Sequence, residues 1–429
     1  MKENLKANNE SVQVEPDSGF NTLKEVPFGG DAFIGPIPED LINIPENVAR
    51  ICLKERMVMD APENRDSYAF NLFANDESYH ALEVFNKKTP GFKNTIDSPD
   101  FWQPERAELQ KYGIRRQFED AVALSESMRA KERELGIHPT IYILSGISAA
   151  GKTTACKKAD YPGMTYEAKS DGAKGNPIGP LATDNSKMYL WLAGGSCDQI
   201  HAESSMMMRQ VDALWGEYVR QKDGDCSEVR DKTFSEIGDI EGIIRDAKET
   251  NRRICDLDID VPFMVSAVGV MMRPKGSHEP HPGFEYLREN YAEMRRTRSE
   301  KLKSIYPDSG LEIAYSLKCY DYTSDPKERQ KEVARYEKDS DGKPRLVVLD
   351  QALFDQAVVT EEGSDICFEE ANSVGDQLVT KEFIEEYCQK FINPDEQSYI
   401  EKVRSSLGVY VDEDSPKKVR DILNNNANA

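Results

Sequence analysis

The order of apolar and polar positions predicts alternating strands and helices through the middle of the chain. Residues 140–145 form a β-branched apolar run that ends at a glycine, which is typical of a buried strand. Apolar positions recur with a helical period over residues 198–221 and 237–250, and strand-like segments occupy residues 228–233 and 311–320. This alternation favours an α/β fold in which a parallel sheet is flanked by helices.

Segments with weaker patterns complete the picture. Residues 104–135 have a charged helical pattern that leads into the strand at 140–145, and residues 284–304 read as a basic helix. After a strand at 346–350 we expect a loop rich in Glu, Ser and Asp, and we expect the Asn-rich residues 424–429 to be a frayed tail. Further helices are predicted at residues 152–159, 381–392 and 395–407, and further apolar segments at 253–258 and 262–271.

These patterns divide the chain into four parts. Residues 1–30 are polar and aperiodic, and are predicted to be a disordered leader. Residues 31–135 form an accessory N-terminal region that ends in a helix, and residues 136–325 form the α/β core. Residues 326–429 are a C-terminal α/β extension and tail. The expected fold is therefore an α/β core with helical N- and C-terminal extensions.

Composition limits the partners of the protein. The 429 residues carry a net charge of −22 and no dense block of Lys and Arg, so a nucleic-acid partner is disfavoured. Eight scattered cysteines form no CxxC pair, which favours reduced thiols and a cytoplasmic location. No apolar run approaches the length of a membrane span, so we predict no membrane partner. The N-terminus lacks the apolar core of a Sec signal, so secretion into a host cell would need another route.

The segment directly after the strand at 140–145 carries the clearest chemistry. Residues 146–153, Gly-Ile-Ser-Ala-Ala-Gly-Lys-Thr, satisfy the Walker A pattern G-x-x-x-x-G-K-[ST]. Gly146 and Gly151 allow a tight turn whose N–H groups, with the helix dipole, stabilise phosphate oxygens. Lys152 would act on the outer phosphates of ATP and Thr153 would bind Mg²⁺. The predicted ATP-binding residues of the loop are Gly146, Ser148, Ala149, Ala150, Gly151, Lys152, Thr153 and Thr154.

A kinase also needs a carboxylate that accepts the proton of the acceptor hydroxyl. Asp184, in the sequence Ala-Thr-Asp-Asn-Ser-Lys, follows a Gly-rich loop and is the predicted catalytic base. The alternative is that Asp184 caps a helix over residues 187–192.

Three further residues are predicted to contact the substrate. His201 and Glu203 lie near the start of the helix at 198–221, where an ordinary solvated helix start is the alternative. Asp231 follows a short strand, and open α/β sheets place their ligands at such strand ends. The alternative for Asp231 is the N-cap of the helix that begins after Ser235.

Arginines are the preferred stabilisers of a transferring phosphoryl group. Arg273 follows an apolar run, and Arg295, Arg296 and Arg298 cluster on the basic helix at 284–304. We predict that Arg273 and Arg298 contact phosphates, and that Arg298 is catalytic together with Lys152 and Asp184. The alternative for the cluster is pairing with acidic residues three or four positions away, such as Glu293 and Glu300.

The order of these segments resembles the zeta-toxin-like P-loop kinases, and most of all the branch of bacterial type III effectors that phosphorylate NAD. The resemblance covers roughly residues 140–325 and is carried by GISAAGKTT, ATDNSK, QIHAESS, VRDKTFSEIGDIEGII, CDLDIDVPFMVSAVGVMMRP and NYAEMRRTR. It implies an ATP- and Mg²⁺-dependent kinase that phosphorylates a hydroxyl of NAD or of a UDP-sugar. It also implies a toxin or effector, with an antitoxin or chaperone protein as a partner. In zeta toxins an acidic segment like that of Asp184 follows the second strand.

The chain departs from the family at several positions. Ser186 stands where a second acid is usual, and Ala149 and Ala150 replace glycines and serines that are common in the loop. Two other functions stay open. A P-loop NTPase switch would need a Walker B carboxylate, for which Asp258 or Asp260 is available. A non-catalytic nucleotide- or partner-binding protein is the second, although the intact Lys152 and Thr153 argue against it.

Overall fold

The computed structural model describes residues 41, 43–60, 96–164, 181–191, 197–273, 281–321, 330–338, 344–412 and 415–427. The predicted leader at 1–30 lies outside these residues. The chain forms two compact units. One comprises residues 1–117, 167–175 and 183–211, and the other residues 118–166, 176–182 and 212–429. None of the helices in the described part of the chain combines the length and the apolar character that a membrane span requires.

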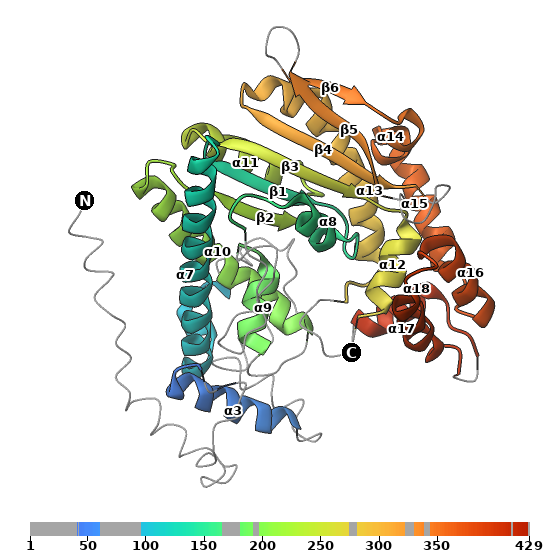
Figure 1. Cartoon of the computed structure of the whole chain (residues 1–429). Coiled ribbons are helices and arrows are strands. Elements are labelled where there is room, and N and C mark those ends of the chain that lie inside the picture. The colour runs from blue at the N-terminus through green and yellow to red at the C-terminus, as the bar shows by residue number, and fades with distance from the viewer. Residues whose placement is uncertain are drawn as a thin grey trace. The chain divides into compact units, whose positions relative to one another are not determined.

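The larger unit is built on a mixed sheet, which confirms the α/β fold (Figure 1). Six strands are described, in the spatial order β2-β1-β3-β4-β5-β6. The first four are parallel, and β5 and β6 continue the sheet as antiparallel neighbours. The strands are β1 Thr140–Ser145, β2 Glu228–Lys232, β3 Arg253–Asp260, β4 Ile313–Tyr320, β5 Gln330–Lys338 and β6 Pro344–Val348.

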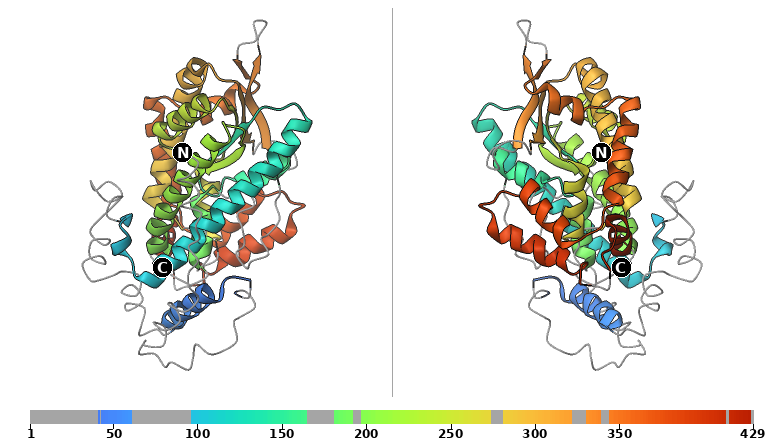
Figure 2. Two further views of the ribbon diagram at one scale, coloured as in Figure 1. Left: turned by 90° about the vertical axis from the view of Figure 1, so that its left-hand side faces the viewer. Right: turned by 90° about the vertical axis from the view of Figure 1, so that its right-hand side faces the viewer.

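Helices cover both faces of this sheet (Figure 2). Successive residues of β1 point to opposite faces, so Tyr142 and Leu144 pack with α8 and α12 while Ile141 and Ile143 pack with α11. All of β1 is buried, which explains its continuous apolar run. The helical segments of this unit are α8 Lys152–Ala159, α11 Ile237–Glu249, α12 Phe263–Met271, α13 Phe284–Glu300, the π-helical turn η5 Lys301–Ile305 and the 3₁₀ turn η6 Pro307–Ser309.

The C-terminal part of the chain is more helical than we predicted. The expected loop after residue 350 is largely two helices. Residues 424–427 of the expected frayed tail belong to a helix in which Leu423 and Asn426 are buried. The buried apolar residues of the second helix, Cys367, Ala371 and Val374, are small or widely spaced among charged residues. The sequence therefore shows no clear helical period there. The C-terminal helices are α14 Gln351–Ala357, α15 Glu361–Gly375, α16 Lys381–Phe391, α17 Gln397–Gly408 and α18 Val419–Ala427.

Strand β5 was missed because its sequence, QKEVARYEK, is dominated by charged residues. Among the side chains of β5 that the structure describes, only Val333 and Ala334 are buried, and the strand is held by backbone pairing with β4 and β6. Together β5 and β6 extend the core sheet past the predicted domain boundary at residue 325.

The smaller unit is helical where it is described. Helix α3 (Glu46–Asp60) buries its side chains Val48, Ile51 and Cys52. The 3₁₀ turn η4 (Pro99–Phe101) precedes the long helix α7 (Pro104–Glu134). Helices α9 (Thr183–Trp191) and α10 (Cys197–Gln221) follow. Both α7 and α10 continue from this unit into the larger one.

Candidate active site

Four parallel strands end at one edge of the sheet, and this edge carries the predicted phosphate chemistry. The loop that joins β1 to α8, residues 146–151, leaves from the central strand β1. Asp231 lies near the end of β2, Asp260 ends β3 and Tyr320 ends β4. Ligands of open α/β sheets bind at this edge, outside the carboxyl ends of the strands.

The loop has the conformation of an anion-binding nest. Ala149 and Gly151 have positive φ angles of 59° and 82°, whereas Ala150 between them does not. Backbones of this alternating kind direct successive N–H groups into a concavity that favours negative charge. Gly146 has a φ of 150°, and a Cβ atom there would lie 2.8 Å from the carbonyl oxygen of Ile259 on β3. Only glycine therefore fits the first position of the loop.

Lys152 begins α8 and folds its side chain back over this loop. Its Nζ donates hydrogen bonds to the carbonyl oxygens of Gly146 at 2.9 Å and Ile147 at 3.2 Å. The same Nζ lies 3.7 Å from Oδ1 of Asp231. We predicted Asp231 only as a substrate contact, and its pairing with the Walker lysine follows from the side-by-side strands β1 and β2, which the sequence does not reveal.

Thr153 and Thr154 occupy the first turn of α8, the former half-buried and the latter exposed. Tyr320 borders the other end of the loop, because its hydroxyl oxygen would lie 3.3 Å from a Cβ atom on Gly151. Burial, together with the nearby Glu396 and Tyr399, raises the pKa of Tyr320, so its hydroxyl is a neutral hydrogen-bonding group at pH 7. The sequence analysis did not single out Tyr320, since only the strand order brings it to the loop.

The basic helix has a different role from the one we predicted. Alternate residues of β3 and every third residue of α13 and η5 form a buried network of ion pairs. Its members are Asp256, Asp258 and Asp260 on one side and Arg295, Arg298 and Lys301 on the other. Arg298 binds both oxygens of Asp258, at 2.8 and 2.9 Å, and also contacts Asp260, with a side-chain exposure of 1%. An internal ion pair thus replaces the phosphate contact predicted for Arg298.

The same network binds the candidate Walker B residues, Asp258 and Asp260. Burial alone would raise the pKa of Asp258, but the charges and hydrogen bonds of Arg298 and Lys301 outweigh it and hold that pKa below its usual value. Asp260 binds Arg295 at 2.7 Å and Arg298 at 2.9 Å. Asp258 is therefore ionised, and both carboxylates pair with internal cations.

The remaining arginines have distinct positions. Arg296 pairs with Glu293 at 2.6 Å and Glu300 at 2.7 Å on the surface of α13, as the alternative interpretation of this cluster expected. Arg273 is half-buried just beyond α12, and its carbonyl oxygen lies 2.9 Å from Nε2 of His281.

Asp184 lies in the smaller unit, in the first turn of α9. Its side chain is 46% exposed and accepts a hydrogen bond of 2.8 Å from the buried Lys187. In the described residues the second strand is β2, which comes after Asp184 in the chain, so within this part of the chain Asp184 does not follow a second strand as it would in the zeta toxins.

Glu203 is fully buried on α10 within the same unit. It accepts hydrogen bonds from Nε and Nη2 of Arg106 at 2.7 and 2.8 Å and from Gln110 at 2.6 Å. Both oxygens are engaged and none of the side chain is exposed, so Glu203 joins α10 to α7 and does not make the substrate contact that we predicted. His201 lies on α10, and its side chain is outside the described residues.

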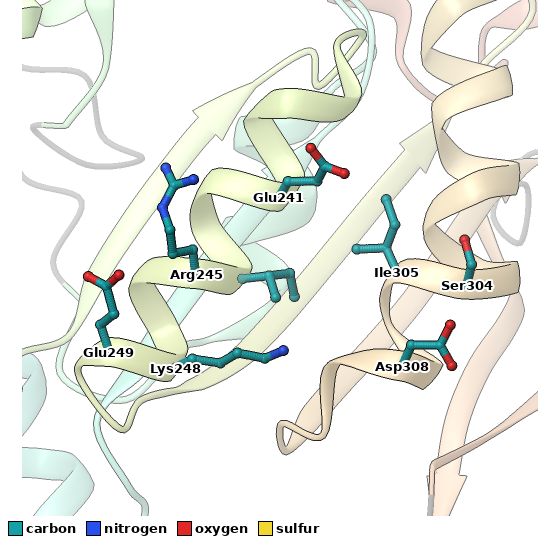
Figure 3. A pocket seen from close by; sticks show the side chains of 8 residues that line it. Glu241, Arg245, Lys248, Glu249, Ser304, Ile305 and Asp308 are labelled. Carbon is teal, nitrogen blue, oxygen red and sulfur yellow. The ribbon is translucent and has the colours of Figure 1, made fainter.

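A cavity of about 670 Å³ lies elsewhere on the larger unit (Figure 3). Along one wall, α11 presents Glu241, Arg245, Lys248 and Glu249 in turn, and η5 and η6 form the other wall. No residue that we predicted for the active site lines this cavity. Its wall carries both acidic and basic side chains, so it favours neither an anionic nor a cationic ligand.

Comparison with known proteins adds to this geometry. No family model and no curated protein matches the sequence. The structure is similar to a chain of the AvrRxo1-ORF1:-ORF2 complex in its native form, with 23% identity and a TM-score of 0.61 over 80% of this chain and 95% of the other. A chain of the AvrRxo1-ORF1:AvrRxo1-ORF2 complex with sulphate ions matches with 22% identity and a TM-score of 0.61, over 80% of this chain and 96% of the other. A chain of the complex with ATP matches with 23% identity and a TM-score of 0.60, over 80% of this chain and 95% of the other. At this identity the likeness shows a shared fold.

Proposed function

We propose that this protein is a kinase that transfers the γ-phosphoryl group of ATP to a hydroxyl group of a small nucleotide. NAD and UDP-sugars are the acceptors we propose. The observation that carries the proposal is the phosphate loop, in which Lys152 is held by the carbonyl oxygens of Gly146 and Ile147 beside Asp231. The solved structure with ATP, a chain of which has a similar fold, supports ATP as the phosphoryl donor.

The loop residues fit a bound triphosphate. The positive φ angles of Ala149 and Gly151 form a nest for phosphate oxygens, and a side chain at Gly146 would collide with β3. Lys152 would leave its two carbonyl partners to contact the outer phosphates. Thr153, with Asp231 nearby, would hold Mg²⁺, which neutralises charge on the phosphates when it is bound.

Two carboxylates have separate proposed roles. Asp231 lies next to Lys152, near the end of β2, which pairs with the strand β1 before the phosphate loop. Its proposed role is to help Thr153 to hold Mg²⁺. Asp184 accepts the proton of the acceptor hydroxyl, because it is an exposed carboxylate on a helix terminus. Arg273 is the arginine that we retain as a phosphate contact.

The structure also weighs against an NTPase switch that uses Asp258 or Asp260. Both carboxylates are buried and bound to arginines of α13, so neither is available to magnesium or water. An NTPase would have to rely on Asp231. Hydrolysis of ATP in the absence of an acceptor distinguishes this function from a kinase.

We further propose that the protein is a bacterial toxin or effector that works with a partner protein, an antitoxin or chaperone. The solved complexes each pair an ORF1 with an ORF2 chain, which supports a protein partner. The protein would act in the producing bacterium or, by a route without a Sec signal, in a host cell.

The experiment incubates the protein with ATP labelled at the γ-phosphate, Mg²⁺ and a panel of NAD, UDP-sugars and other nucleotides. Label on one nucleotide that is lost in Lys152→Ala would support the kinase. Replacement of Lys157, an exposed lysine on the same helix, by Ala is the matched control and should leave transfer intact.

Other results would change the assignment. Release of labelled phosphate without any labelled nucleotide would favour the NTPase. Binding of ATP without turnover, with every acceptor in the panel, would favour a non-catalytic binding protein, and the absence of ATP binding would overturn the proposal.

A further inference from the structure

Helix α12 contacts two consecutive residues at the tip of the phosphate loop. The hydroxyl of Ser266, which is fully buried, donates a hydrogen bond of 2.7 Å to the carbonyl oxygen of Ser148. One turn further along α12, a Cβ atom on Gly269 would lie only 2.7 Å from the Cβ of Ala149. Real Cβ atoms do not approach so closely, so the helix and the loop meet at a distance that only glycine allows.

The contacted loop residue is in an unfavourable conformation. Ala149 has a φ of 59°, in the left-handed region that is unfavourable for a residue with a Cβ atom. Such a conformation persists only where the surroundings enforce it. The contacts of Ser266 and Gly269 flank Ala149 and provide that constraint.

Helix α12 is itself held in place by the C-terminal helices. Its buried residues pack in one apolar cluster with side chains of α15 and α18, among them Ala371, Val374, Ile422 and Leu423. The backbone N–H of Phe263, at the start of α12, also donates a hydrogen bond to Glu370 of α15. The C-terminal extension thus supports the face of α12 that the loop does not cover.

We propose that α12 is a brace that fixes the phosphate loop in its nucleotide-receiving conformation, with Ser266 and Gly269 as positioning residues. The C-terminal helices supply the rigid support behind it. This inference rests on the proposed nucleotide-binding function of the loop. It assigns a role to the extension, because α15 and α18 add apolar partners for α12 to those that α13 provides.

The test uses Gly269→Ala in the full chain, with Gly238→Ala on α11 as the control, since a Cβ at Gly238 has no atom within 4 Å. Both changes replace a helical glycine by the best helix former, so neither weakens its helix. We expect Gly269→Ala to weaken ATP binding, measured by calorimetry with Mg²⁺, by roughly tenfold or more, as overpacking of this size does. Gly238→Ala should match the unmodified protein.

A double variant makes the test specific. Adding Ala149→Gly to Gly269→Ala removes the methyl group with which the new side chain collides, and Gly accepts the φ of 59°. The double variant should recover most of the lost affinity. Ser266→Ala, which only deletes the hydrogen bond to Ser148, should weaken binding in the same direction and serves if Gly269→Ala does not fold.

Hydrogen exchange of the ligand-free protein gives a readout that does not depend on ATP. Amides of residues 147–154 should exchange faster in Gly269→Ala than in Gly238→Ala, while the strands keep their protection. Equal exchange and equal affinity in the two variants would overturn the brace. If the unmodified protein does not bind ATP but the exchange of the loop still responds, the proposed function fails and the brace stands.

Discussion

The ammonium group of Lys152 lies 3.7 Å from the carboxylate of Asp231, although the two residues are 79 positions apart in the chain (231 − 152). Lys152 begins α8, the helix that follows β1, and Asp231 belongs to β2, the strand that pairs with β1. At this distance the charges compensate each other while the loop holds no phosphate. A triphosphate would compete with Asp231 for the lysine, and a divalent cation would restore the balance. The pair therefore predicts a dependence on magnesium.

Asp231→Asn should lower the rate of phosphoryl transfer roughly 100-fold, as loss of one charged group in a phosphate site does, without weakening the binding of metal-free ATP. Binding of metal-free ATP is not weakened because the substitution removes a negative charge that repels the phosphates. The rate falls because the substitution also removes the carboxylate proposed to help to hold Mg²⁺. Steady-state kinetics and calorimetry in EDTA check the two parts. Asp239→Asn, which removes the surface partner of Lys232, is the control. An unchanged rate would mean that Asp231 only neutralises Lys152.

Asp184→Asn should reduce transfer to the acceptor by about 10²–10⁴-fold, because the amide cannot accept the hydroxyl proton, while ATP still binds. Transfer is measured with labelled ATP, and binding by calorimetry. Asp365→Asn, an exposed acid on α15, should have no effect. Normal turnover in the Asp184 variant would show that Asp184 is not the catalytic base.

Arg298→Met should lower the free energy of unfolding by about 3–5 kcal/mol, because Asp258 and Asp260 would keep their buried charges without this partner. Arg296→Met on the same helix should cost less than about 1 kcal/mol, since its pairs with Glu293 and Glu300 are partly exposed. Urea unfolding measures both. Weaker ATP binding with unchanged stability would instead restore Arg298 as a phosphate ligand.

Glu203→Gln should also act on stability, lowering the free energy of unfolding by about 3 kcal/mol, because it removes the negative charge to which the buried guanidinium of Arg106 donates two hydrogen bonds. Glu108→Gln, which affects the exposed pair with Lys111 on α7, is the matched surface control. Thermal unfolding compares them. A changed KM for the acceptor with an unchanged melting temperature would favour the substrate contact first predicted for Glu203.

The stability of the protein should fall as the pH drops below about 4. The pKa of Asp258 is lower in the folded than in the unfolded state, so the folded protein binds fewer protons in the acid range. The stabilisation is present above the ordinary carboxyl pKa and is lost as the pH falls toward the lowered value. Urea unfolding between pH 3 and 7 measures this loss, which should be smaller in Asp258→Asn. A profile identical in both proteins would contradict the assignment.

The sequence by itself determined the phosphate loop and most of the elements around it. The Walker A residues and the strand before them are contiguous, so their chemistry and conformation depend on local sequence. The apolar periods of residues 237–250 and 381–392 likewise correspond to α11 and α16. Elements with a narrow or absent apolar face, such as β5 and α15, were missed because backbone pairing and a few small buried residues hold them.

Only the tertiary structure decided which charged residues lie at the candidate site and which lie in the core. Arg298 and Glu203 look like site residues in the sequence, but both are buried against opposite charges from distant elements. Asp231 and Tyr320 gained importance because the strand order places them beside the loop. Ionic partners, and contacts such as that of Gly269 with Ala149, join residues far apart in the chain, and their pairing depends on the packing of strands and helices that no local pattern encodes.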